Sequence, residues 1–153
     1  MLVNRRKLRI EWGDCDPAGI VYFPRYFQHF DNATVALFEK ATGLKKIAMS
    51  DEFEFAGIPM VNIRARFLIP SRYGDDVEIE SQITEFRRSS FEVSHKLFRG
   101  KDLAVECFET RVWTVRDEES PGGLKSATVP DSIKNAFSAK ATKTPSRAAK
   151  KKA

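Results

Sequence analysis

Two aspartates flank a cysteine in residues 12–26, which read WGDCDPAGIVYFPRY. Because Asp14 and Asp16 lie two positions apart, an extended backbone would place both carboxylates on one side of the chain. Paired carboxylates can divide acid and base roles in catalysis. An aspartate followed by Pro-Ala-Gly is also typical of an ordinary turn, and the spacing alone favours the turn. The choice therefore depends on the elements that flank this loop.

The acidic loop separates two segments with different hydrophobic periods. Residues 7–12 alternate polar and apolar, which predicts a half-buried strand with Ile10 and Trp12 pointing inward. After Pro24, apolar residues recur every three or four positions and predict an amphipathic helix capped by Gly43. Its apolar face comprises Phe27, Phe30, Thr34, Leu37, Phe38 and Ala41. The acidic loop therefore ends at the N-terminus of a long helix.

The start of this helix supplies what acyl transfer would require. The first turn of a helix has unpaired N–H donors and a partial positive charge. Because Pro24 has no N–H, the amide of Phe23 is a candidate donor for an oxyanion. A carboxylate opposite such donors could attack a carbonyl carbon or activate a water molecule, and the sequence does not separate these two roles.

The other reactive side chains are weaker candidates. A reactive cysteine needs positive neighbours, whereas Cys15 has an aspartate on each side. We expect His29 on the flank of the helix, and His95 on an apolar strand face as a core or interface residue. The two histidines and two cysteines lack the spacing of metal ligands, so we expect no metal site.

The second half of the chain alternates with a period of two. Strands are predicted at residues 61–69, 77–83, 91–97 and 103–115, with a hairpin turn at residues 100–102. Shorter elements are predicted at residues 44–49 (helix), 125–128 (edge strand) and 130–137 (helical turn). One strand, one long helix and then strands in a meander predict an α+β fold. In this fold a curved antiparallel sheet of about five strands wraps the helix, and its second face meets another subunit.

Composition predicts one domain at residues 1–138 and a basic, disordered tail at residues 139–153. The chain has 153 residues and a net charge of +5. Its last sixteen residues hold six of the 26 Lys and Arg residues and none of the 21 Asp and Glu. The tail therefore accounts for the basic character, and we favour a solubilising role over nucleic-acid binding. Without a long apolar run, a signal-peptide pattern or a P-loop, we expect a cytoplasmic protein that neither contacts membranes nor hydrolyses nucleotides.

The acidic loop and its surroundings resemble the 4-hydroxybenzoyl-CoA thioesterase family, whose members adopt the hotdog fold. The resemblance rests on the predicted strand at residues 7–12, on residues 13–21 (GDCDPAGIV), and on the aromatic pair before Pro24. Residues 57–59 (GIP) and 85–88 (EFRR) are similar to the family as well. The resemblance extends from about residue 5 to residue 137 and excludes the basic tail.

The resemblance implies specific roles for residues in both halves of the chain. It implies that Asp16 is the catalytic carboxylate and that the Phe23 amide polarises the thioester carbonyl. The implied substrate contacts are Asp31, Pro59 and Val61. The implied contacts to CoA are Arg87, Arg88, Ser89 and Ser90, although the family has a lysine where this chain has Ser89. It implies an acyl-CoA substrate, no cofactor, and a homotetramer of hotdog dimers with sites between subunits.

Read without the resemblance, two of these groups have ordinary explanations. Asp31 would face solvent from the middle of the helix, and residues 87–90 would form a solvated hairpin end.

Three functions stay open at this point. The preferred one is hydrolysis of an aromatic acyl-CoA thioester of the benzoyl or hydroxybenzoyl type. A sister group of thioesterases, associated with the Tol-Pal envelope system, has a histidine just before the helix, where this chain has Phe23 and Pro24. Short-chain aliphatic thioesters are therefore less favoured. The third function is a non-catalytic acyl-CoA binding module, against which the intact Asp16 argues.

Overall fold

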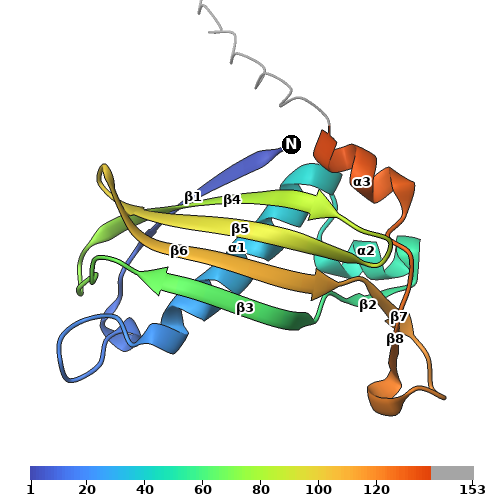
Figure 1. Cartoon of the computed structure of the whole chain (residues 1–153), viewed down its shortest axis with the longest axis horizontal. Coiled ribbons are helices and arrows are strands. Elements are labelled where there is room, and N and C mark those ends of the chain that lie inside the picture. The colour runs from blue at the N-terminus through green and yellow to red at the C-terminus, as the bar shows by residue number, and fades with distance from the viewer. Residues whose placement is uncertain (139–153) are drawn as a thin grey trace, which may run out of the picture.

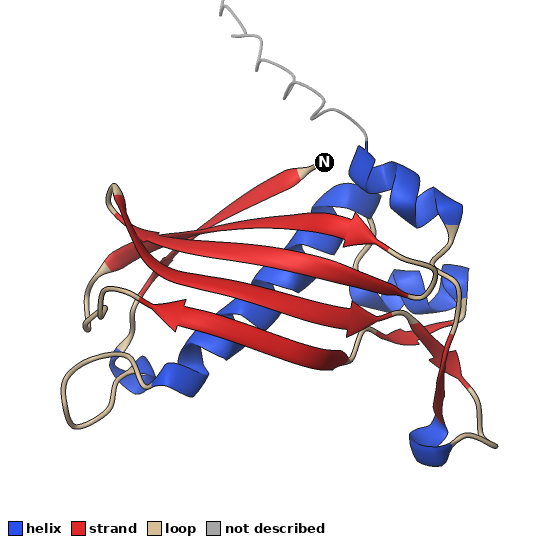
Figure 2. Ribbon diagram, in the orientation of Figure 1, coloured by secondary structure: helices blue, strands red, loops and turns tan. Residues whose placement is uncertain are grey.

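The computed structural model describes residues 1–138 and shows one long helix packed against an antiparallel sheet (Figure 1 and Figure 2). The helix, α1 (Phe23–Thr42), lies behind the sheet in Figure 1 and crosses its strands diagonally. The five strands, in spatial order, are β1 (Val3–Arg9), β4 (Asp76–Phe86), β5 (Ser90–Arg99), β6 (Asp102–Val112) and β3 (Met60–Phe67). The predicted α+β class, with one helix against a sheet of five strands, is confirmed.

The strand order differs from a simple meander. β4, β5 and β6 are consecutive neighbours as predicted, but β3 pairs with β6, and β1 pairs with β4. β1 occupies the edge next to β4, so β3 lies at the opposite edge of the sheet. The predicted meander of four strands was therefore wrong. Alternation specifies which face of a strand is buried, but it does not specify the neighbouring strand.

Local signals set the limits of α1. Gly43 follows its last residue with φ of 70°, the left-handed conformation that a glycine C-cap adopts. Pro24 stands in the first turn, where its missing N–H breaks no intrahelical bond. The buried face of α1 comprises Tyr26, Phe30, Ala33, Thr34, Leu37 and Phe38. Phe27 and Ala41, predicted on this face, are only partly buried.

Two apolar clusters fill the space between α1 and the sheet. One includes Phe30, Ile79 and Leu97, and the other includes Phe38 and Trp113. The inward alternation predicted for residues 77–83 and 91–97 is confirmed, because every inward position there is buried. Each large apolar side chain buried in this way contributes about 1.5–3 kcal/mol to folding. The same inward rows also carry two polar residues, Ser81 and His95, which are fully buried.

Some predicted inward side chains face solvent instead. Trp12 is 77% exposed, because β1 ends at Arg9 and the chain turns into a short 3-10 helix, η1 (Trp12–Asp14). Val61 and Phe67 are 61% and 49% exposed. Both belong to β3, an edge strand of the sheet, where little of the protein covers them.

Short elements cover one end of the sheet. They are α2 (Lys46–Phe53), β2 (Phe55–Gly57), β7 (Thr114–Arg116), η2 (Pro121–Gly123), β8 (Leu124–Ser126) and α3 (Asp131–Ser138). β2, β7 and β8 form a second, three-stranded sheet that we did not predict. The strand predicted at residues 103–115 is divided between β6 and β7. Residues 139–153, including the predicted tail, lie outside the described residues. Within residues 1–138, no helix is long and apolar enough to cross a membrane.

Candidate active site

The acidic loop folds back against the start of α1. The carbonyl of Asp14 accepts a hydrogen bond from the Tyr22 amide at 2.8 Å, and the Asp16 amide donates to the carbonyl of Ile20 at 3.0 Å. Gly19 closes the turn with φ of 79°, a conformation that other residues rarely adopt. The loop therefore holds Asp14 against Tyr22, the residue that precedes the helix, with Asp16 two positions further on.

Asp16 is oriented by its own loop. Its Oδ1 accepts a hydrogen bond from the Ala18 amide at 2.8 Å, which forms an Asx turn. The side chain is only partly buried. Among residues 1–138, no hydrogen-bond partner contacts Oδ2. Asp16 thus combines a fixed orientation with one carboxylate oxygen that could react.

Asp14 has a different environment from Asp16. Its Oδ1 lies 3.0 Å from Nε2 of His29, and its Oδ2 accepts a hydrogen bond from the Glu11 amide at 2.8 Å. The side chains of His29 and Asp14 are 19% and 13% exposed. Because His29 belongs to α1, this pair connects the loop directly to the helix. Asp14 therefore supports the loop, while Asp16 keeps an available oxygen.

The first residue of α1 has an amide with no acceptor inside the helix. Phe23 begins the helix, so no residue of the helix can accept a hydrogen bond from its N–H. Its N-cap residue provides no side-chain capping bond. The Phe23 ring is 55% exposed and contacts Phe27 and Phe67 edgewise, at 6.2 and 6.5 Å between centroids. The helix start therefore combines a backbone donor with an aromatic wall.

Two hollows meet along α1. The first lies beside the N-terminal half of the helix, between Pro24, Phe27 and Met60. The second is a more enclosed cleft of about 370 Å³ among α1, α2 and β2, lined mostly by apolar side chains. Asp31 lines both hollows, and Pro59 lines the second. Val61, also predicted to contact substrate, lines neither.

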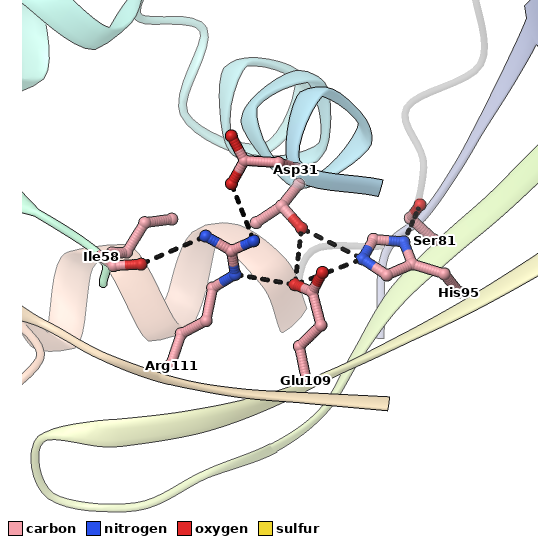
Figure 3. A network of polar contacts seen from close by, with 7 residues as sticks. Asp31, Ile58, Ser81, His95, Glu109 and Arg111 are labelled. Carbon is pink, nitrogen blue, oxygen red and sulfur yellow. Dashed lines mark hydrogen bonds and ion pairs between the residues drawn. The ribbon is translucent and has the colours of Figure 1, made fainter. Parts of the chain in front are cut away.

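Asp31 is not the isolated surface residue that its position in the sequence suggests. Its Oδ1 accepts a hydrogen bond from Nη2 of Arg111 at 2.8 Å. Nε of Arg111 donates to Oε2 of Glu109 at 2.7 Å, and Nη1 donates to the carbonyl of Ile58 at 3.2 Å. Figure 3 shows these side chains converging between α1 and β6. Arg111 therefore links a residue of the helix to the interior of the sheet.

The polar network continues into the core behind Arg111. Oγ1 of Thr34 donates to Oε2 of Glu109 at 3.3 Å and lies 3.1 Å from Nε2 of His95. Nδ1 of His95 lies 2.7 Å from Oγ of Ser81 (Figure 3). Burial opposes ionisation of Glu109, but hydrogen bonds from His95 and Arg111 outweigh it and hold the pKa of Glu109 below its usual value. His95 is the hydrogen-bonded core histidine that we expected.

The predicted CoA contacts lie at the opposite end of the sheet from the acidic loop. Residues 87–89 follow the end of β4, whereas β1 pairs with β4 so that the acidic loop adjoins its start (Figure 1). β4 has 11 residues. At about 3.3 Å per residue, its ends are roughly 35 Å apart. One chain therefore does not bring Asp16 and Arg87 to the same place.

The arginine pair is held by its neighbours at that turn. Arg87 forms ion pairs with Glu85 and Glu92 at 3.1 and 3.0 Å, and these contacts raise the pKa of its guanidinium. Nη1 of Arg88 donates to Oγ1 of Thr128 at 3.3 Å. Ser90 begins β5, directly after this turn. Both arginines stay exposed, so a ligand could reach them.

The sequence model of the thioesterase-like superfamily matches residues 10–137. The chain belongs to this superfamily. The 4-hydroxybenzoyl-CoA thioesterase of Pseudomonas sp. (strain CBS-3) is 40% identical over 117 residues, which cover 72% of this chain and 82% of that protein. A 1,4-dihydroxy-2-naphthoyl-CoA hydrolase of Gloeothece citriformis (strain PCC 7424) is 31% identical over 101 residues, which cover 65% of this chain and 67% of that protein.

A solved structure agrees with this membership. The crystal structure of a 4-hydroxybenzoyl-CoA thioesterase mutant with bound 4-hydroxybenzoyl-CoA superposes with a TM-score of 0.80 and 32% identity, covering 88% of this chain and 98% of that one. The resemblance seen in the sequence is therefore confirmed, and so is the hotdog fold. The chain is a thioester hydrolase.

Sequence reasoning missed three polar residues in this thioesterase. Glu109 and Arg111 follow Cys107 at every second position, in the inward row of β6. Two charged residues in an otherwise apolar row could have indicated a buried ion pair. No pattern in the sequence indicates the contact of His29 with Asp14, because this contact joins a loop to a helix.

Metal binding has no support in the part of the thioesterase that the structure describes. Residues 1–138 contain no group of three His, Cys, Asp or Glu side chains that could hold a metal ion. The two cysteines are free thiols. Burial, and then the nearby Glu109 charge, raises the pKa of Cys107 to about 12, so this thiol is a packing residue.

Proposed function

We propose that this thioesterase hydrolyses an aromatic acyl-CoA of the benzoyl type to the free acid and CoA. The observation that carries the proposal is the environment of Asp16, a partly buried carboxylate with one unbonded oxygen, in a loop that is hydrogen-bonded to Tyr22, the residue before the first residue of α1. The relatives that act on 4-hydroxybenzoyl-CoA and 1,4-dihydroxy-2-naphthoyl-CoA support an aromatic acyl group. A cytosolic location stays a prediction.

The proposed reaction uses the helix start and the acidic loop together. The thioester oxygen accepts a hydrogen bond from the Phe23 amide, and the partial positive charge of the helix N-terminus stabilises the oxyanion. Asp16 either attacks the carbonyl carbon, giving an anhydride that water cleaves, or takes a proton from the attacking water. In both routes the C–S bond breaks and CoA leaves as its thiolate. The aromatic wall around Phe23 limits water and so strengthens these charge interactions.

The length of α1 between Phe23 and Asp31 supports a single aromatic ring as the acyl group. Asp31 lies eight residues after Phe23. This is about 12 Å along the axis at 1.5 Å per residue. Because side chains on a helix tilt toward its N-terminus, the Asp31 carboxylate lies closer to Phe23 than this axial distance. A short aliphatic acyl group would end before reaching Asp31.

The proposed CoA contacts require a second copy of the chain. Arg87 lies roughly 35 Å from the acidic loop along β4, as estimated from strand geometry. β3 is an edge strand with the exposed apolar side chains Val61 and Phe67, which favours pairing with another strand. We infer that two copies join their sheets at β3, with Val61 in the interface. Dimers of this kind would build the predicted homotetramer.

The function is tested by replacing the proposed catalytic carboxylate. Asp16→Asn keeps the size of the side chain and should lower kcat by about 10²-fold or more without changing the fold. Thiol release is measured with benzoyl-, 4-hydroxybenzoyl-, phenylacetyl- and short aliphatic CoA esters. Asp102→Asn, at the exposed first residue of β6, is the matched control and should behave like the wild type.

Two results would change the proposal. Activity of Asp16→Asn within about tenfold of the wild type would remove Asp16 from its role. A wild-type protein that binds these CoA esters but hydrolyses none of them would indicate the binding module instead.

A further inference from the structure

A chain of buried polar side chains ends at one exposed carboxylate. The side chains of Glu109 and Arg111 are 0% and 5% exposed, whereas that of Asp31 is 58% exposed. Burying an ion pair costs several kcal/mol of desolvation for each ion, and apolar side chains of similar volume often stabilise a fold better. Stability alone therefore gives no reason for charges at this place.

The charges of this cluster are unequal in number. Arg111 carries one positive charge and contacts two carboxylates, Glu109 at 2.7 Å and Asp31 at 2.8 Å. With His95, 3.5 Å from Glu109, in its neutral form, Glu109 alone neutralises Arg111, and the cluster has one negative charge in excess. That charge lies at the exposed end of the cluster, on Asp31, where the two hollows meet.

The network also restricts how Asp31 can move. Arg111 donates from Nε to Glu109 and from Nη1 to the carbonyl of Ile58, which fixes the plane of the guanidinium. Glu109 is in turn held by Thr34 and His95. A fixed guanidinium sets the direction of the Asp31 carboxylate that it contacts. Oδ2 of Asp31 has no hydrogen-bond partner within residues 1–138.

We propose that Arg111 is a positioning residue, which holds Asp31 as a hydrogen-bond acceptor at the far end of the acyl group. This inference rests on the proposed function, and it adds Arg111 as the residue that orients the substrate contact implied for Asp31. A ring hydroxyl or amino group would donate to Asp31 and be preferred. A ring without a donor would leave a desolvated carboxylate oxygen unpaired, at a cost in binding. A ring carboxylate would meet the excess negative charge and be rejected.

The test compares three esters that differ at one ring position. They are 4-hydroxybenzoyl-CoA, benzoyl-CoA and 4-carboxybenzoyl-CoA, and kcat/KM is measured for wild type, Arg111→Lys, Asp31→Asn and the double variant. Arg111→Lys keeps the positive charge but loses the planar guanidinium, whose several N–H donors contact Glu109, Ile58 and Asp31 together. It should reduce the preference for the hydroxylated ester over benzoyl-CoA by about tenfold, mainly by lowering kcat/KM for the hydroxylated ester. Arg5→Lys, at an exposed ion pair on β1, is the control and should keep the wild-type preference.

The double variant separates positioning from general packing. If Arg111 acts through Asp31, then adding Arg111→Lys to Asp31→Asn changes the preference no further. Asp31→Asn should also admit the 4-carboxybenzoyl ester, because it removes the excess charge. If Arg111→Lys lowers kcat/KM for all three esters equally, or if its effect adds to that of Asp31→Asn, the inference is overturned while the proposed function stands. A wild type that hydrolyses none of the three removes both.

A second variant covers the case in which Arg111→Lys does not fold. Glu109→Gln keeps the shape of the side chain and an acceptor for Nε of Arg111, but it weakens the hold on the guanidinium. It should lower the preference for the hydroxylated ester in the same direction by a smaller factor. A folded Glu109→Gln protein with the wild-type preference would overturn the inference.

Discussion

The contact between His29 and Asp14 predicts that His29→Leu loosens the acidic loop. The substitution removes a bond of 3.0 Å between side chains that are 19% and 13% exposed. A hydrogen bond to a charged group contributes about 1.5–3 kcal/mol, which partial exposure reduces here. Because Asp14 also keeps its bond to the Glu11 amide, we expect a loss of about 1–2 kcal/mol in unfolding free energy. The melting temperature should fall by about 3–6 °C.

The effect on the loop can be measured separately from the effect on the whole fold. The Tyr22 amide donates to the carbonyl of Asp14, so its hydrogen exchange reports opening of the loop from α1. A loss of about 1.4 kcal/mol in the local contact corresponds to about tenfold faster exchange. Displacement of Asp16 in the loosened loop should lower kcat by about tenfold and change KM less.

A matched variant tests the physical reason. His29→Gln keeps an N–H donor that can reach Asp14, and it should restore most of the exchange protection and of kcat. Unchanged Tyr22 exchange and unchanged kcat in His29→Leu would show that the loop is held by its backbone bonds alone. The reasoning would then be refuted, even if the melting temperature had fallen.

Two further predictions concern the buried network and the edge strand. Because the folded pKa of Glu109 lies below its ordinary value of 4.5, the unfolded chain binds more protons in that range. The stability that Glu109 contributes is therefore present above about pH 4.5 and lost as pH falls. The free energy of unfolding of Glu109→Gln, measured with urea, should then fall less steeply below this pH than that of the wild type. An equal slope for the two proteins would contradict this. If two copies pair at β3 as proposed, Val61→Lys should lower the mass measured by sedimentation to that of one chain, whereas Ile47→Lys, on exposed α2, should not. An unchanged mass of Val61→Lys would count against pairing at β3.

The parts of the fold that depend on local interactions could be predicted from sequence. Alternation identified the buried rows of β4 and β5, and Gly43 identified the end of α1. The side of the sheet on which β3 lies could not be predicted, because it depends on where β1 docks. The exposure of Trp12 and Val61 has the same origin, since both positions are set by the ends and edges of the assembled sheet.

The same difference between local and long-range contacts applies to the candidate site. Asp16 and Phe23 are close in sequence, so one loop and one helix start suffice to place them together. Arg111 and Asp31 are 80 positions apart, and their contact depends on how α1 crosses β6. A pattern along the chain shows that β6 carries charges on its inward side, but not which helix residue meets them. The family resemblance implied a role for Asp31 without any indication of this partner.

The separation of Asp16 from Arg87 and the exposure of β3 are explained by one arrangement. When two identical edge strands pair antiparallel about a twofold axis, each end of one sheet faces the opposite end of the other. The acidic loop of one copy then lies at the end where its partner carries the arginine pair. In the proposed dimer, the distance along β4 would therefore let each chain supply one half of two sites. A motif match can name every residue of such a site, but it cannot tell which copy provides each one.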